Sequence, residues 1–275
     1  MSAITANPAL AAAGDERSRT MPFLLQVTTM TWRSLVTIFR DPASVVPGLV
    51  ISVFFVLVYE ASLNGAARFF LPGQSYLGFI LPVSIVSSAL SGASIAGQAI
   101  VRDIENGYFD KLLLTPINRA ALLLGPMIAG ALVLVLQTML VILVGVILGL
   151  RPETGIPGLL AVLGYSLLLG VAFAGFVVGI ALRTGSASAT GGASFLFFPL
   201  SFLTATFTPI DLLSGWIRTA AEYNPITYIL EAMRAIFNTG WNAEVMGRGV
   251  TASLIIALIT FTFAYLSLRA RTREK

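Results

Sequence analysis

The sequence predicts an all-α membrane protein with six transmembrane helices, an N-terminal interfacial amphipathic helix and an outer re-entrant helix pair before the last span. Charged residues make up 11% of the 275-residue chain, whereas soluble domains contain about 25%. The mean hydropathy is +0.88. Six long stretches are almost free of charge, and each is about long enough to cross a ~30 Å hydrocarbon core as a helix. These predicted spans are residues 43–59, 75–101, 120–150, 157–182, 186–207 and 250–268.

Residues 1–20 come before the membrane domain. They combine alanine with proline, glycine and charge, and their apolar run is too short for a signal peptide. We therefore expect a disordered cytoplasmic tail, followed by a single transmembrane domain over residues 21–275.

The first element of that domain is a helix predicted over residues 22–41. On a helical wheel, Gln26, Arg33, Thr37 and Arg40 fall on one side and the apolar residues on the other. Such a helix lies in the membrane interface, with its arginines toward the headgroups. The alternative is a cytoplasmic helix packed on a partner protein. The apolar side consists of Leu24, Leu25, Val27, Trp32, Leu35, Val36, Ile38 and Phe39.

The second predicted span carries serines at helical spacing along one face. One interpretation is a helix that lines a polar translocation pathway. The other is close packing between helices through small residues, which is common in membranes. Gln98 and Gln137 are the strongest polar groups inside the spans. The candidate pathway residues are Ser84, Ser87, Ser88, Ser91, Gln98 and Gln137, and Ser94 shares the serine face.

Residues 102–119 form the longest predicted inner loop. The loop has a charged start, a glycine at Gly107, an amphipathic Phe-Asp-Lys-Leu-Leu run and a Thr-Pro turn before Arg119. Gly107 permits a bend or a close approach of the backbone. The pattern predicts a compact cytoplasmic projection between two spans.

The segment 208–248, before the last span, is too apolar for a solvated loop and too interrupted for a span. Asn224-Pro225 divides it, because proline cannot continue a helix. In the second half, Thr227, Glu231, Arg234 and Asn238 form one polar stripe at helical spacing. This pattern predicts two short helices that dip into the outer leaflet and pack against protein. We expect them to close the outer end of a pathway, with Asn224, Pro225, Glu231 and Arg234 as the key residues.

The distribution of basic residues predicts the orientation. If the N-terminus is cytoplasmic, the inner segments hold 12 of the 17 Lys and Arg residues and the outer segments hold 5. Cytoplasmic loops carry the excess of positive charge in membrane proteins. We therefore expect a multi-pass protein of the cell (plasma) membrane with both termini in the cytoplasm.

Several functional classes are excluded by composition. The chain has no Cys and no His, which rules out disulfides, Cys/His metal sites and Ser-His catalysis. No ionisable residue lies near the centre of a span, where ion-coupled carriers place them. The sequence also lacks the phosphate-binding G-x-x-x-x-G-K-[ST] motif. We expect no catalytic residue and no metal or cofactor in this chain, so energy for transport would come from another chain.

The loop over residues 102–119 resembles the corresponding motif of ABC-2 type permeases, the membrane subunits of ATP-binding-cassette exporters. An acidic-basic start, a glycine and a Leu-Leu-x-Thr-Pro-Ile-x-Arg end recur there. Arg40-Asp41-Pro42 before the first span is similar too, as are Phe207-Thr208-Pro209, the segment 224–228 and the segment 231–234. The resemblance covers nearly the whole chain beyond residue 20, and within the family it is closest to daunorubicin-resistance-type drug exporters.

The resemblance implies a six-span subunit that works with a second permease copy or paralogue and with two separately encoded ATPase subunits, which hold ATP and Mg. It implies export of an amphipathic compound such as a drug, an antibiotic or a lipid. A related permease exporting a lipid-linked glycan or polymer is one alternative, and a non-transporting membrane scaffold or sensor is another. We expect contact with membrane lipids and none with nucleic acid.

An exporter without its own ATP site must receive motion through a cytoplasmic contact, and the loop 102–119 is the one inner loop long enough to provide it. We expect its charged residues to pair with an ATPase groove, and Phe109 and Leu112 to fill an apolar pocket there. The candidate coupling residues are Arg102, Asp103, Glu105, Gly107, Phe109, Asp110, Lys111 and Leu112.

Overall fold

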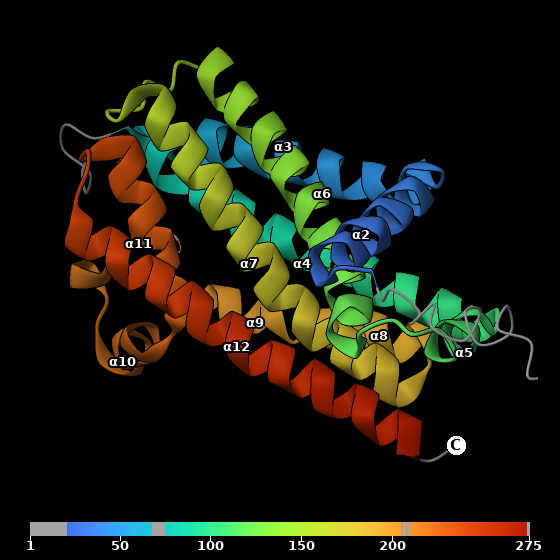
Figure 1. The fold of residues 1–275 in the computed structure, drawn as a ribbon. Helices are drawn as coiled ribbons and strands as arrows, with labels where there is room; N and C mark the ends of the chain where they lie inside the picture. The colour runs from blue at the N-terminus through green and yellow to red at the C-terminus, as the bar shows by residue number, and fades with distance from the viewer. Residues whose placement is uncertain (1–20, 68–74, 205, 207–208, 274–275) are drawn as a thin grey trace, which may run out of the picture.

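The computed structural model describes residues 21–67, 75–204, 206 and 209–273, and all the regular elements in these ranges are helices (Figure 1). The predicted tail over residues 1–20 lies outside the described residues. In chain order the elements are α2 (Phe23–Phe39), α3 (Pro42–Ala67), α4 (Tyr76–Glu105), α5 (Tyr108–Leu113), α6 (Arg119–Ile147), α7 (Gly155–Thr184), α8 (Ala187–Phe195), α9 (Phe197–Phe202), the 3-10 turn η1 (Ile210–Leu212), α10 (Gly215–Tyr223), α11 (Pro225–Asn238) and α12 (Ala243–Arg273).

Five of the described helices, α3, α4, α6, α7 and α12, are long and apolar enough to cross a membrane. They correspond to five of the six predicted spans. The other predicted span, residues 186–207, does not form one continuous helix, because α8 and α9 are divided at Leu196. Pro199 accounts for the division, since it has no amide to donate to the carbonyl of Phe195 and its ring crowds that carbonyl. The total of six spans remains a prediction.

The bundle has a buried centre and two exposed flanks. In α4 and α7, 78% and 72% of the most apolar window is buried, against 17% in α3 and 28% in α12. Figure 1 shows α3 and α12 on opposite sides of the bundle, with α4 and α7 between them. The lipid-facing or partner-facing surface therefore belongs mainly to α3 and α12.

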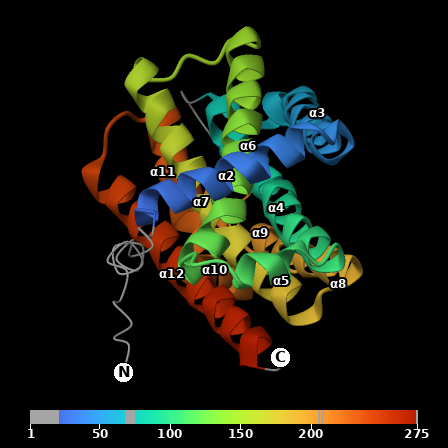
Figure 2. The ribbon, with the colours of Figure 1, turned by 45° about the vertical axis from the view of Figure 1, so that its right-hand side comes forward.

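Helix α2 lies across the bundle near the end that carries α5 (Figures 1 and 2). It packs mainly on α6 and buries one narrow face, which includes Met30, Ser34 and Ile38. Leu24, Trp32 and other apolar residues beside that face are exposed. An exposed apolar strip next to a polar flank suits a helix at the membrane interface, and that position remains a prediction. Gln26, predicted on the polar side, is buried instead.

At the opposite end of the bundle lie the two short helices that Asn224-Pro225 separates. Helix α10 ends at Tyr223 and α11 begins at Pro225. Helix α11 packs on α4, α7 and α12 and is buried along most of its length, whereas in α10 Ala221 is the one buried residue. The division is as predicted, and insertion of the pair into the outer leaflet remains a prediction.

Candidate functional site

Two adjoining cavities lie along the serine face of α4. One has a volume of about 340 Å³ and lies between α3, α4 and the aromatic side chains Phe195 and Phe202. The other, of about 350 Å³, lies between α4 and α8. They share Leu90, Ser91 and Phe195, so we treat them as one feature, the α4 groove. Its walls are α3 on one side, α8 and α9 on the other, and α4 at the base.

Four of the six candidate pathway residues line the α4 groove: Ser87, Ser88, Ser91 and Gln98. Their hydroxyls and amides are partly used within α4 itself. The Ser88 hydroxyl donates to the Ser84 carbonyl at 2.8 Å, and the Gln98 amide donates to the Ser94 hydroxyl at 3.2 Å. Serine and threonine side chains commonly bond to the carbonyl one turn earlier. These hydrogen bonds within α4 lower the cost of placing the polar base of the groove among apolar side chains.

The two other candidate pathway residues, Ser84 and Gln137, are buried rather than lining the α4 groove. Ser84 is 1% exposed and Gln137 is fully buried. Among the described residues, the Ser84 hydroxyl and both atoms of the Gln137 amide have no hydrogen-bond partner. A Cβ added at Gly48 would crowd Ser91 and come within 2.7 Å of the Gln137 amide nitrogen. Gln137 thus lies behind the groove, where α3, α4 and α6 meet.

The inner loop is held in place by a turn at each end. Gly107, with φ of +64°, lies in the left-handed region and redirects the chain from α4 into α5. At the other end, Asn118 caps α6 by accepting from the Ala120 amide at 2.9 Å. The backbone N–H of Asn118 donates to the side-chain oxygen of Gln26 at 2.8 Å. The loop is therefore fixed to the start of α2 as well as to its own two helices.

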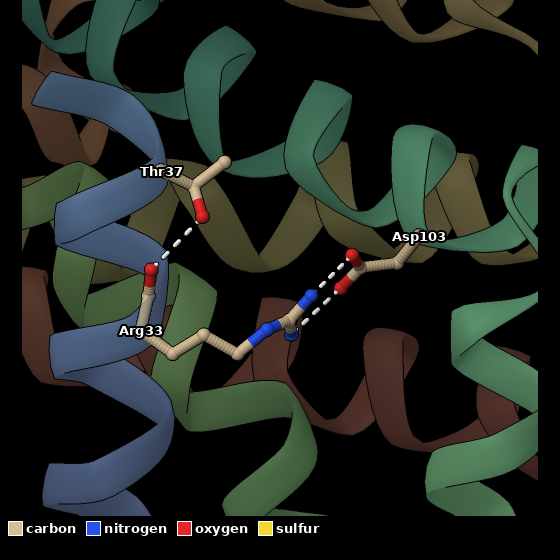
Figure 3. Close-up of polar contacts among 3 residues, drawn as sticks. All are labelled: Arg33, Thr37 and Asp103. Atoms are coloured by element: carbon tan, nitrogen blue, oxygen red, sulfur yellow. Dashed lines mark hydrogen bonds and ion pairs between the residues drawn. The ribbon is translucent and has the colours of Figure 1, made fainter. Parts of the chain in front are cut away.

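An ion pair joins the polar flank of α2 to the end of α4 (Figure 3). The Arg33 guanidinium donates both terminal nitrogens to the Asp103 carboxylate, one of them at 2.9 Å. It also lies 4.2 Å from the centre of the Tyr108 ring. A second pair, Arg102 with Asp41, spans 3.2 Å. These contacts connect α2, α4 and α5. All of their residues except Asp41 line a cavity of about 370 Å³, which Lys111 also lines.

The candidate coupling residues divide into two groups in the structure. Phe109 is fully buried and Leu112 is 7% exposed, in a cluster with Met30 of α2 and Leu123 of α6. These two side chains pack inside this chain, so in this structure they do not offer an apolar surface to a partner. Arg102 and Asp103 are likewise paired within the chain. Glu105 and Lys111 are exposed, and Gly107 and Asp110 are partly exposed.

Two exposed apolar residues of the loop escaped the sequence reasoning: Leu114, which is 88% exposed, and Tyr108, which is 39% exposed. The helical spacing of the loop residues could have indicated which of them are exposed. Phe109 and Leu112 are three residues apart and so share one face of α5. Once that face is assigned to the interior, Leu114 must point elsewhere.

The outer segment contacts the wall of the α4 groove that α9 forms, and Asn224 makes this contact. Asn224 caps α11, and its amide nitrogen donates to the carbonyls of Leu200 and Leu203 at 2.7 and 2.9 Å. Pro225 occupies the first turn, where a missing amide costs nothing. Arg234 is buried, and Glu231 is partly buried. The polar stripe of α11 therefore faces inward, toward protein.

Comparison with known proteins places the chain in a family. The sequence model of the family described as ABC-2 type transporter matches residues 25–238. That range includes most of α2, the inner loop, the α4 groove and α11.

Three relatives have drug-resistance or multidrug names. A probable doxorubicin resistance ABC transporter permease protein, DrrC, of Mycobacterium tuberculosis is 26% identical over 77% of this chain and 76% of its own length. The daunorubicin resistance ABC transporter permease protein DrrB1 of Streptomyces coeruleorubidus is 22% identical over 82% of this chain and 79% of its own. A probable multidrug ABC transporter permease, YbhR, of Escherichia coli is 21% identical over 73% of this chain and 54% of its own.

The family match extends over well more than half of the chain and includes four of the five helices of spanning length. This chain is a multi-pass membrane protein that belongs to the ABC-2 type transporter family.

Proposed function

We propose that this chain is the membrane-spanning permease subunit of an ATP-driven exporter, and that it moves an amphipathic compound out of the cytoplasm or the inner leaflet. The observation that carries the proposal is the α4 groove. Its lining combines serine hydroxyls and the Gln98 amide with Phe195 and Phe202, and none of the described residues that line its two cavities is charged. Pockets that combine an apolar wall with a few polar groups suit amphipathic ligands. The resistance names of the relatives support the same substrate class.

The energy source in this proposal is an ATP-binding-cassette ATPase subunit, present in two copies, which binds ATP and Mg. ABC-2 permeases work with such a partner. The exposed tip of the inner loop is the docking surface, with Glu105, Lys111 and Leu114 in contact with the ATPase. Phe109 and Leu112 act by holding α5 against the bundle. The contacts of Arg33 with Tyr108 on α5 and with Asp103 on α4 transmit the motion of α5 to α2.

A second permease copy or a paralogue completes the pathway. Helix α3 is the least buried of the helices of spanning length, yet it forms one wall of the α4 groove. Its exposed apolar residues include Val50 and Phe54, which are 60% and 57% exposed. Contact between two such surfaces would enclose a pathway between the copies, with both termini and α5 on the cytoplasmic side.

The test is reconstitution of the permease with the ATPase that co-purifies with it. We expect substrate-stimulated ATP hydrolysis and ATP-dependent uptake of an anthracycline into inside-out vesicles. Ser87→Trp should fill the α4 groove and remove most of this uptake while the complex still assembles. Leu143→Trp is the matched control, because Leu143 is exposed on α6. Absence of a co-purifying ATPase, or full uptake in the Ser87→Trp variant, would contradict the proposal.

A further inference from the structure

Arg234 is a buried cation on α11, and it lies beyond the residues that line the α4 groove. Arg234 is 8% exposed, and it takes part in none of the ion pairs between described residues. Glu231, one turn earlier on α11, interacts with it only through space. Burying a charge without an ionic partner is costly unless the charge is well hydrogen-bonded. The contacts that compensate Arg234 are therefore informative.

Two backbone carbonyls and one ring hold the guanidinium. Its Nε donates to the Phe79 carbonyl at 3.0 Å, and one terminal nitrogen donates to the Thr206 carbonyl at 2.9 Å. The guanidinium also lies over the Phe79 ring, 3.5 Å from its centre. Cation–ring contact of this kind strengthens when both groups are shielded from water.

Phe79 and Thr206 belong to the segments that continue from the base and from one wall of the α4 groove, and neither residue lines its two cavities. Phe79 lies on α4 about two helical turns before Ser87, the first serine that lines the groove. Thr206 comes shortly after Phe202, the last lining residue of α9. One side chain therefore connects the outer end of α4 with the outer end of the segment that follows α9.

The local sequence of α4 favours close packing of α11 on it. Pro82 lies inside α4 and has no amide, so the Gly78 carbonyl lacks its usual helical donor and the helix can bend there. Gly78 also lets α11 approach closely, because a Cβ at that position would collide with Asn238. The Asn238 amide donates to the Ser75 carbonyl at 3.2 Å. Helix α11 is thus fixed on α4, and Arg234 extends from it to Thr206.

We propose that Arg234 is a positioning residue for export, which holds the outer ends of α4 and of the segment after α9 together and keeps the α4 groove closed to the outside until substrate leaves. This inference rests on the proposed function and assigns the outer closure to one side chain. Separating Phe79 from Thr206 requires at least one of the two hydrogen bonds to break. Arginine suits the position because its planar fork can donate to two acceptors at once, whereas a lysine ammonium lacks the fork and stacks poorly.

The first experiment measures access to the groove from outside. Ser87→Cys is placed alone and together with Arg234→Met, Arg234→Lys or Arg218→Met, and intact cells without added substrate receive a membrane-impermeant thiol reagent. The native chain has no cysteine, so the label reports one site. We expect Arg234→Met to raise the labelling rate roughly tenfold, as loss of hydrogen bonds to a charged group should, and Arg234→Lys to give an intermediate rate.

Arg218→Met is the matched control and should leave the labelling rate unchanged. Arg218 is in the same outer segment but is half-exposed and pairs with Glu222 on α10. Trp241→Cys, at an exposed position, shows that the reagent reaches the outer surface. An unchanged rate in Arg234→Met would overturn the proposal. If that variant does not accumulate in the membrane, the Lys variant and Phe79→Leu decide, and unchanged rates in both would overturn it.

The second experiment separates positioning from general stability. In the reconstituted complex, Arg234→Met should increase the ATP hydrolysed per molecule exported, and Arg234→Lys should restore part of the wild-type ratio. A variant that is merely less stable would lose ATP hydrolysis and export together, and this result would overturn the proposal. If the wild-type complex shows no coupled transport, the proposed function fails, while the labelling comparison still tests the closure.

Discussion

Gln137 is a polar residue at a buried position where an apolar side chain would be more stable. Its amide is fully buried at the junction of α3, α4 and α6 and has no hydrogen-bond partner among the described residues. Leaving a buried donor or acceptor unpaired costs about 1–3 kcal/mol, more than the bond itself contributes when it is made. The residue therefore lowers the stability of this conformation, which is what a group used in another conformation would do.

Replacing this amide should stabilise the protein. Gln137→Met keeps the length of the side chain and removes both unpaired atoms, so we expect a gain of roughly 1 kcal/mol, or about 2–4 °C in melting temperature. Gln98→Met is the control, since that amide donates to Ser94 and lines the α4 groove. Thermal unfolding of the purified variants makes the comparison. A lower melting temperature for Gln137→Met would mean that the amide is paired in the membrane.

At the scale of elements, the connection between α2 and α4 is the feature with the clearest consequence. Arg33 and Asp103 are about one-third and one-fifth exposed, so their pair is better shielded than those on the surface. Isolated surface pairs contribute about 0–1 kcal/mol, and hydrogen bonds to charged groups about 1.5–3 kcal/mol. We therefore expect this pair to matter for the relative position of α2 and the inner loop.

A charge reversal tests that expectation. Arg33→Asp and Asp103→Arg should each lower substrate-stimulated ATP hydrolysis, because each places two like charges side by side. The double variant should recover a large part of the loss, which a double-mutant cycle measures. Reversal of the exposed Arg248–Glu244 pair should have no effect. Failure of the double variant to recover activity would mean that Arg33 and Asp103 do not act together.

The elements differ in how far the sequence could predict them. The long spans and the break at Asn224-Pro225 were predictable, because charge-free length and proline act locally. The division at Leu196 was missed although Pro199 was a signal for it, since the segment has apolar length enough for one helix. Pairing of Arg33 with Asp103 links residues 70 positions apart, and no local pattern encodes such a contact. The burial of Phe109 likewise depends on α2 and α6.

At the scale of the whole molecule, the long helices begin and end alternately at the two ends of the bundle. The orientation of the molecule in the membrane can therefore be tested directly. Single cysteines at Glu105 and Ser186, at the end that carries α5, should resist an impermeant thiol reagent in intact cells. Cysteines at Glu153 and Trp241, at the end that carries α11, should react. The excess of basic residues at the α5 end motivates the expectation. Strong labelling at Ser186 would reverse the orientation or change the number of spans.

The short link between α2 and α3 has a mechanical consequence. Only Arg40 and Asp41 separate the two helices, which have 17 and 26 residues and therefore lengths of about 26 and 39 Å. If they turn together about this link, the pair acts as a bent lever whose input arm is attached to α5 and whose output arm is a wall of the α4 groove. A displacement at the start of α2 would then be magnified ~1.5-fold at the far end of α3. A small movement driven by ATP would widen the groove most at its outer end.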